Sequence, residues 1–260
     1  MAPLLMGVLN VTPDSFSDAG CFLDREAAIA HGLAMARAGA DVVDVGGEST
    51  RPGAEPVDEA EERHRVLPVV EALAPHVRVS IDTSKATVAV AAVAAGATLV
   101  NDVTASLHSV AADTGVGWVA MHMQGEPRTM QLDPRYDDVV GEVRGFLVER
   151  AEAALEAGVG EVWIDPGIGF GKTKEHNLSL LRRLSSLVET GHPVVVGTSR
   201  KSFLGALAGG APVTDRLEGS LATAVHAVSQ GARMVRVHDV GPTVQALRLT
   251  AGVSPTGVSR

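Results

Sequence analysis

The sequence predicts an α/β protein that folds as a single-domain (β/α)₈ TIM barrel, and two observations support this prediction. Short apolar runs typical of buried strands recur eight times along the 260 residues. Ala-rich segments with helical spacing lie between them, and several end in Ala-Gly or Gly-Ala, which commonly stops a helix. Alternating strands and helices call for a parallel sheet, and eight such units fit a closed barrel better than an open sheet.

Each expected strand and several helices can be placed on the sequence. The strands, in chain order, are 4–11, 42–46, 77–83, 98–103, 117–123, 161–166, 193–199 and 234–240. Helical spacing is clearest in 25–40, 84–97 and 137–158. We expect the barrel to span 1–252, with 253–260 as a frayed C-terminal tail. A doubly wound sheet is the alternative fold, although the GxGxxG turn of its dinucleotide-binding version is missing.

Composition excludes several classes of function. A hydrophobic content of 45% is enough for one large core, and the net charge of −9 argues against broad binding to nucleic acid or anionic membranes. The longest apolar stretch, 88–100, is too short to span a bilayer, and residues 1–14 lack a basic leader. We therefore expect a cytoplasmic protein that binds neither nucleic acid nor membrane. The single cysteine, Cys21, excludes a disulfide framework and is expected in a loop.

Polar side chains gather at the carboxyl ends of the expected strands. Because alternate strand residues face opposite ways, Ser80 shares a face with Asp82, and Arg236 shares one with His238. Four other strands also carry a polar residue near this end, namely Asn10, Asp44, Asn101 and Asp165. A single polar strand end would be an ordinary turn residue. Six of eight indicate a functional cluster, because active sites of barrel enzymes lie at this end.

Two kinds of charge meet in this predicted cluster. The acceptors suit a ligand rich in N–H donors, such as an aminopyrimidine ring, and they are Asp44, Asp82, Asn101 and Asp165. The cations and histidine suit phosphate or carboxylate, and they are Arg51, Lys201, Arg236 and His238. A substrate with a polar heterocycle at one end and phosphate at the other satisfies both sets. Taken singly, Asp44 could equally accept from loop amides, and His122 and His226 could be structural histidines.

The segment GIGFGKT at 167–173 looks like a phosphate-binding P-loop but does not meet its spacing. Three residues separate Gly167 from Gly171, one fewer than the motif requires. We interpret it as a barrel loop whose glycines admit a ligand near Phe170 and Lys172. The sequence has no HExxH motif, so any metal ion is expected to be a hard cation held by oxygen ligands and phosphate.

Nine stretches of sequence together resemble the dihydropteroate synthase family. They are GVLNVTPDSFSDAG, DVGGESTRPGA, SIDTSK, VNDV, MHMQGEP, DPGIGFGK, GTSRKSFLG, DRLEGSLA and RVHDV, in this order over residues 6–240. The resemblance implies a (β/α)₈ enzyme of folate synthesis, usually a homodimer. It also implies the reaction: p-aminobenzoate is joined to 6-hydroxymethyl-7,8-dihydropterin diphosphate, and pyrophosphate is released with Mg²⁺.

The resemblance also implies roles for single residues. The pterin ring would be held by Asp82, Asn101, Asp165 and Lys201, with Met121 on its face. The diphosphate would contact Thr50, Arg236 and His238, and Asn10 would be associated with Mg²⁺. The p-aminobenzoate pocket would include Pro52, Phe170, Ser199 and Lys201, with mobile loops carrying Asp14, Phe16, Ser17 and Arg51. The catalytic set is expected to be Asp82, Lys201, Arg236 and His238.

Two departures from the family pattern leave alternatives open. Ala19 stands where glycine is common, and Thr104-Ala105 replaces the frequent Ser-Gly after the fourth strand. Neither coincides with a matched contact, so they concern loop dynamics and turnover more than the type of reaction. A non-catalytic pterin-binding paralogue is one alternative. A pterin-dependent methyltransferase barrel is the other, and the ESTRP and SRKS segments favour the synthase over it.

Overall fold

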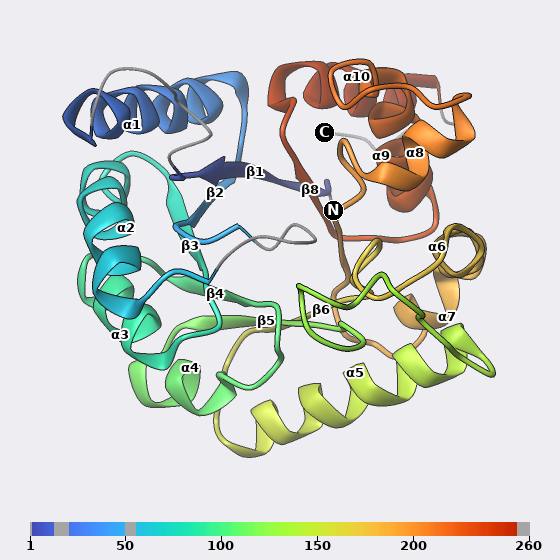
Figure 1. Ribbon diagram of the computed structural model, residues 1–260, viewed down its shortest axis with the longest axis horizontal. Helices are drawn as coiled ribbons and strands as arrows, with labels where there is room; N and C mark the ends of the chain where they lie inside the picture. Colours follow the sequence, from blue (N-terminus) through green and yellow to red (C-terminus); the bar gives the residue numbers. More distant parts are fainter. Residues whose placement is uncertain (1, 13–20, 50–55, 254–260) are drawn as a thin grey trace.

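Eight parallel strands form one closed sheet in the computed structural model, which describes residues 2–12, 21–49 and 56–253 (Figure 1). The strands are β1 (Leu4–Asn10), β2 (Val42–Gly46), β3 (Arg78–Asp82), β4 (Leu99–Asp102), β5 (Gly117–Met121), β6 (Val162–Asp165), β7 (Val195–Val196) and β8 (Met234–Val237). Their order is β6-β5-β4-β3-β2-β1-β8-β7, and a bridge between Ile164 and Val194 joins the two ends. The predicted barrel is confirmed, and the doubly wound alternative is wrong.

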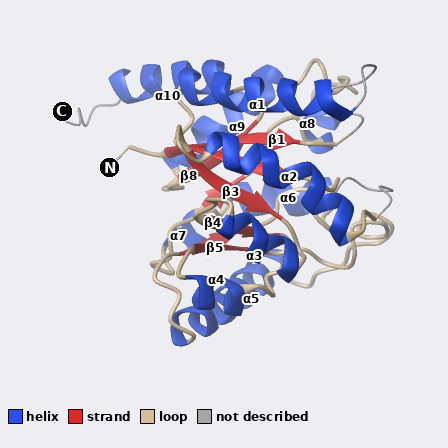
Figure 2. Cartoon of the chain, turned by 90° about the vertical axis from the view of Figure 1, so that its left-hand side faces the viewer, coloured by secondary structure: helices blue, strands red, loops and turns tan. Residues whose placement is uncertain are grey.

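Helices surround the strands on the outside of the barrel (Figures 1 and 2). They are α1 (Cys21–Ala38), α2 (Glu59–Leu73), α3 (Ala86–Ala94), α4 (His108–Thr114), α5 (Val139–Glu156), α6 (Lys174–Arg182), α7 (Ser185–Val188), α8 (Ser202–Leu207), α9 (Leu217–Ser229) and α10 (Val240–Val253). Cys21 opens α1 rather than lying in a loop, because this helix begins one turn before the predicted 25–40. None of the helices in the described ranges is both long and apolar enough to cross a membrane. Residues 254–260 of the predicted tail lie outside the described residues.

Two apolar layers hold the barrel together. The inner layer fills the barrel and consists of Met6, Val42, Leu99, Val119, Trp163, Val195 and Met234. The outer layer lies between strands and helices, and on β8 it takes Val235 and Val237. Met234 and Arg236 therefore face inward, which confirms the predicted alternation. The apolar inner layer occupies the amino ends of the strands and leaves the carboxyl ends to polar side chains.

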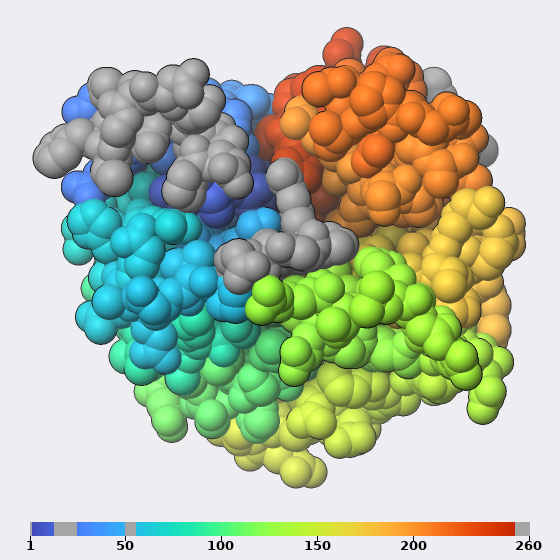
Figure 3. All heavy atoms as spheres, in the orientation of Figure 1, coloured from blue at the N-terminus to red at the C-terminus, as the bar shows by residue number. Residues whose placement is uncertain are grey.

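The parallel register brings the polar strand ends to one rim. Asp82 is in register with Asn101, and Met121 with Asp165. Figure 3 shows this face of the molecule, on which segments from the N-terminal part (blue and cyan), the middle (green) and the C-terminal part (orange) of the chain lie around the centre. Side chains distant in sequence are thus collected around one opening.

Candidate active site

Arg236 joins three strands through part-buried hydrogen bonds. From β8, its Nε lies 2.6 Å from Asp44 Oδ2 on β2, and its Nη2 lies 2.6 Å from Asp82 Oδ2 on β3. Asn101 Nδ2 on β4 donates to the same Asp44 oxygen at 2.9 Å. Asp44 is completely buried, and within the described residues the partners of its carboxylate are these side chains of the site rather than loop amides.

Burial changes the titration of this cluster. Burial raises the pKa of Asp82 to about 7, against the attraction of Arg236 and with the help of the Asp44 charge. Burial lowers the pKa of Arg236, but the charges of Asp44 and Asp82 outweigh it and raise that pKa overall. Arg236 therefore stays charged, while the Asp82 carboxylate can take up a proton near neutral pH.

A second group of predicted residues follows β6 and β7. Gly167 N–H donates to Asp165 Oδ1 at 2.7 Å, which fixes this carboxylate below the loop. Lys201 Nζ donates to the carbonyl oxygen of Ile168 and lies 4.7 Å from the centre of the Phe170 ring. Burial lowers the pKa of Lys201 to about 8, although the charge of Asp165 opposes this shift. The lysine thus sits between an acidic group and an aromatic ring.

Ser199 and His238 form a pair that the sequence did not predict. Ser199 Oγ accepts from the backbone N–H of His238 at 3.1 Å and lies 3.0 Å from its Nδ1. Ser199 is only 5% exposed, so its hydroxyl is directed to the histidine. The sequence analysis had placed the two residues with different substrates. In the structure, Ser199 orients His238 at the end of β8.

The remaining predicted residues divide between the rim and the undescribed segments. Asn10 is half-buried at the end of β1, and Met121 is buried at the end of β5. Outside the described residues lie Thr50, Arg51 and Pro52 of the predicted substrate contacts, together with Asp14, Phe16, Ser17 and Ala19. The predictions for these positions stay predictions.

Ala105, which stands where the family frequently has glycine, adopts a backbone conformation that favours glycine. Ala105 has φ +51°, in the left-handed region that glycine adopts freely and that costs other residues about 1 kcal/mol. Asp102 holds this turn: its carboxylate accepts from the N–H groups of Thr104 (2.9 Å), Ser106 (2.6 Å) and Leu107 (2.6 Å). The turn therefore keeps its shape with alanine in the glycine position.

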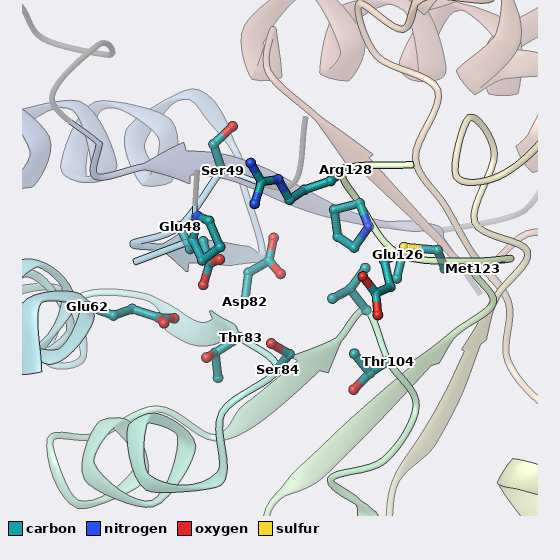
Figure 4. A pocket seen from close by; sticks show the side chains of 13 residues that line it. Glu48, Ser49, Glu62, Asp82, Thr83, Ser84, Thr104, Met123, Glu126 and Arg128 are labelled. Atoms are coloured by element: carbon teal, nitrogen blue, oxygen red, sulfur yellow. The ribbon is translucent and has the colours of Figure 1, made fainter. Parts of the chain in front are cut away.

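A cavity of about 220 Å³ opens beside Asp82. Figure 4 shows the side chains of Asp82, Glu62 and Glu126 reaching it from different sides, with Thr83, Ser84 and Thr104 below. Its wall is acidic and rich in hydroxyl groups. A larger cavity, of about 760 Å³, lies at the amino ends of the strands beside Leu4 and Trp163, away from these polar groups.

The sequence analysis missed a part-buried ion triad beside this cavity. Lys85, at the N-cap of α3, donates to Glu48 in the loop after β2 and, at 2.5 Å, to Glu62 of α2. Glu62 is completely buried within α2. The sequence offered one sign of this triad. Glu62 stands one helical turn before Val66, on the apolar face of the helix, where a carboxylate requires a cation.

The sequence left open whether His122 and His226 are structural histidines, and the structure gives them different surroundings. His226 Nε2 lies 2.9 Å from the carbonyl oxygen of Leu181, which agrees with a structural role. His122 Nδ1 lies 3.0 Å from Nζ of the buried Lys172. The sequence analysis placed Lys172 near a ligand but found no partner for it.

Comparisons with known proteins agree with this geometry. The family described as pterin binding enzyme matches residues 6–238. The chain is 48% identical over 255 residues to dihydropteroate synthase of Escherichia coli (strain K12), covering 95% of this chain and 90% of that protein. Xanthomonas albilineans dihydropteroate synthase with 4-aminobenzoic acid has a TM-score of 0.92 at 48% identity, covering 98% and 94% of the two chains. The structure from that organism in complex with 7,8-dihydropteroate has a TM-score of 0.88 at 45% identity, covering 98% and 95%.

Proposed function

Because the chain belongs to the pterin-binding enzyme family, we propose how its side chains carry out the dihydropteroate synthase reaction. The enzyme is a transferase of folate synthesis. It joins p-aminobenzoate to 6-hydroxymethyl-7,8-dihydropterin diphosphate and releases pyrophosphate. The single observation that carries the assignment of roles is the buried cluster in which Arg236 contacts Asp44 and Asp82, since it places acceptors and a cation at one rim.

The acceptors at the strand ends hold the pterin. Asp82, Asn101 and Asp165 come from β3, β4 and β6, and each is buried or half-buried. Their oxygens suit the N–H groups of the ring, while Met121 lies against its face and Lys201 approaches from the loop after β7. Arg236 fixes the orientation of Asp82 before the substrate arrives, so little reorganisation is needed during the reaction.

Arg236 and His238 serve the diphosphate. An arginine has five N–H donors, and two atoms of this guanidinium are engaged by Asp44 and Asp82. Its remaining donors, together with the His238 ring held by Ser199, offset the negative charge of the leaving group. Thr50, outside the described residues, is proposed as a further diphosphate contact.

Asn10, at the end of β1, could hold Mg²⁺ only together with the phosphates of the substrate. Within the described ranges, no group of three His, Cys, Asp or Glu residues could hold a metal ion. Asn10 offers one neutral amide oxygen, which suits Mg²⁺ because this ion keeps several waters and is usually bound together with substrate phosphates. When bound, Mg²⁺ would supply positive charge to the departing diphosphate, and Asn10 would hold it.

The reaction exchanges a carbon–oxygen bond for a carbon–nitrogen bond. The bond between the methylene carbon and the diphosphate breaks early, and its electron pair leaves with the diphosphate. The positive charge left on the dihydropterin is stabilised by Asp82 and Asp165. The arylamine nitrogen then attacks the methylene carbon, and its extra proton passes to solvent.

The loops after β6 and β7 hold p-aminobenzoate. Phe170 provides an aromatic surface, and Lys201, 4.7 Å from the centre of that ring, provides a cation for both substrates. Ser199 contributes by positioning His238 at the same rim. Arg51 and Pro52, outside the described residues, are proposed to complete this pocket.

Pyrophosphate release tests the proposed function directly. Purified protein is given Mg²⁺ and dihydropterin diphosphate, with and without p-aminobenzoate. Release that depends on p-aminobenzoate, with dihydropteroate as product, is the expected result. Pterin binding in calorimetry without product would instead indicate the non-catalytic paralogue or a transferase with another acceptor.

Pterin binding is expected to weaken below neutral pH. The pKa of Asp82 is raised to about 7 by burial, so lowering the pH through this value protonates the carboxylate and removes an acceptor. If only the ionised form binds, affinity should fall roughly eightfold from pH 7.5 to pH 6. Calorimetry with a pterin ligand checks this. Asp82→Asn should bind weakly with a flat pH profile, and an equal slope in both proteins would contradict the assignment.

We also propose a homodimer, since the resemblance implies one. Light scattering of the purified protein tests it, and a monomer at micromolar concentration would contradict it. The cytoplasmic location stays an expectation.

A further inference from the structure

Lys172 is a buried lysine that the proposed reaction does not use. Burial and the charge of Lys201 lower its pKa to about 7, against the attraction of Asp165. It lies in the loop between β6 and α6 and is only 2% exposed. Its Nζ lies 3.0 Å from His122 Nδ1, 3.1 Å from the His122 carbonyl oxygen and 2.9 Å from the Phe170 carbonyl oxygen. An ammonium has three hydrogens, so these three acceptors use all of them. None of the three is a carboxylate, which is unusual for a buried lysine.

The surroundings keep His122 as a neutral acceptor. Burial lowers the pKa of His122 to about 3, and the charge of Lys172 acts in the same direction. The ring therefore accepts at Nδ1 and carries its proton on Nε2. It packs edge-on against Phe146, with ring centres 5.0 Å apart, and lies 6.0 Å from the Tyr136 ring. The acceptor is thus fixed in place by its aromatic neighbours.

The loop backbone lies directly on the segment that follows β5. A Cβ at Gly167 would be 1.9 Å from the His122 carbonyl oxygen, and one at Gly171 would be 2.2 Å from that of Gln124. Only glycine allows such an approach, and both residues also have positive φ. Lys172 fastens this contact, because it binds the Phe170 carbonyl on one side and the His122 carbonyl on the other.

A second lysine holds the other side of the same loop. Lys201 Nζ donates to the Ile168 carbonyl, and a Cβ at Gly169 would be 3.1 Å from Lys201 Cδ. The backbone from Ile168 to Phe170 is therefore held between Lys201 and Lys172. The position of the Phe170 ring depends on both contacts.

We propose that Lys172 is a positioning residue for p-aminobenzoate: it pins the Phe170 carbonyl to the end of β5 and so holds the Phe170 ring beside Lys201. This inference rests on the proposed role of Phe170 and Lys201 in binding that substrate. Lys172 acts through Phe170 and does not touch the reacting atoms.

Lys172→Met tests the proposal, because methionine keeps much of the side-chain length and removes the donors. The KM for p-aminobenzoate should rise about tenfold, as expected for losing roughly one charge-assisted hydrogen bond. The KM for dihydropterin diphosphate should change less, by under about threefold, because Asp82 and Asn101 come from β3 and β4, and only Asp165 and Lys201 of the pterin set are bonded to the loop. Lys174→Met, at an exposed lysine two residues further on, is the matched control and should leave both constants unchanged.

Amide hydrogen exchange provides a readout that does not depend on activity. Three N–H groups of the loop donate hydrogen bonds: Gly167 to Asp165, Gly169 to Asn177, and Phe170 to the Gly167 carbonyl. Their exchange should be about tenfold faster in Lys172→Met and unchanged in Lys174→Met. If Lys172→Met does not fold, His122→Phe keeps an aromatic ring and removes only the Nδ1 acceptor, and it should raise the same KM and the same exchange rates by a smaller factor.

The outcomes separate the two proposals. Equal KM changes for both substrates, or unchanged exchange in the loop, would overturn the role of Lys172. Wild-type protein that makes no dihydropteroate would overturn the proposed function instead, and the exchange rates would still decide whether Lys172 holds the loop.

Discussion

Arg236→Ala is expected to reduce turnover by about 10²- to 10³-fold, the usual cost of losing one preorganised charge contact to a transition state. In the proposed mechanism Arg236 acts on both separating fragments, because it orients Asp82 toward the pterin and donates to the diphosphate. Steady-state pyrophosphate release at saturating substrates measures this effect. Wild-type turnover in a correctly folded variant would contradict the role of Arg236.

The structure indicates that Arg236→Ala also lowers the free energy of unfolding. Without Arg236, the carboxylates of Asp44 and Asp82 lose their shared cation, and Asp44 is completely buried. Breaking a buried pair by removing one partner costs about 3 to 5 kcal/mol. The sequence analysis, which did not see these pairs, gave no reason to expect such a loss.

A double variant separates the two effects. Asp44→Asn removes the charge of one carboxylate and keeps an oxygen for Asn101, so Arg236→Ala/Asp44→Asn should be more stable than Arg236→Ala alone. Its turnover should stay low, because the donor to the diphosphate is still missing. If turnover recovers together with stability, Arg236 serves the fold and not the reaction.

Lys85→Met is expected to lower the free energy of unfolding by about 3 to 4 kcal/mol, because it leaves a buried charge uncompensated. Glu62 is completely buried, and its Oε1 has no hydrogen-bond partner in the part of the chain that the structure describes. Burial lowers the pKa of Lys85, but the hydrogen bonds that it donates to Glu48 and Glu62 outweigh this effect and raise that pKa overall. The lysine is therefore charged at neutral pH and supplies the compensating charge.

Urea unfolding followed by tryptophan fluorescence measures this loss, since Trp118 and Trp163 are both buried in the barrel. Lys174→Met makes the same exchange at an exposed position and should change stability by less than about 0.5 kcal/mol. Lys85→Met/Glu62→Gln removes the uncompensated charge and should recover much of the loss. A Lys85→Met protein as stable as the control would show that the triad is not a stabilising contact.

Local patterns were sufficient to predict the strands and the polar rim. Short apolar runs predicted all eight strands, because burial on both faces requires apolar side chains wherever the strand passes through the barrel. The predicted boundaries were too long at several ends. β7, expected over 193–199, is only Val195–Val196, with one further bridge from Val194 to Ile164.

Contacts across the barrel could not be read from the sequence. Arg236 and Asp44 are 192 positions apart, and Lys85 and Glu48 are 37 apart, so no local period relates them. Their pairing depends on which strands become neighbours when the sheet closes. The same holds for Lys172 and His122, which meet because the β6–α6 loop lies on the end of β5.

The sequence by itself determined the barrel, the inward-facing residues and the kind of chemistry at the rim, because these follow from side-chain periodicity and residue type. Only the tertiary structure decided which polar groups become partners: Arg236 pairs with two aspartates, Lys85 pairs with two glutamates, and Lys172 bonds to an imidazole and two carbonyl oxygens. Electrostatic energies depend on distance and on burial, and both are fixed only when strands far apart in the chain pack together.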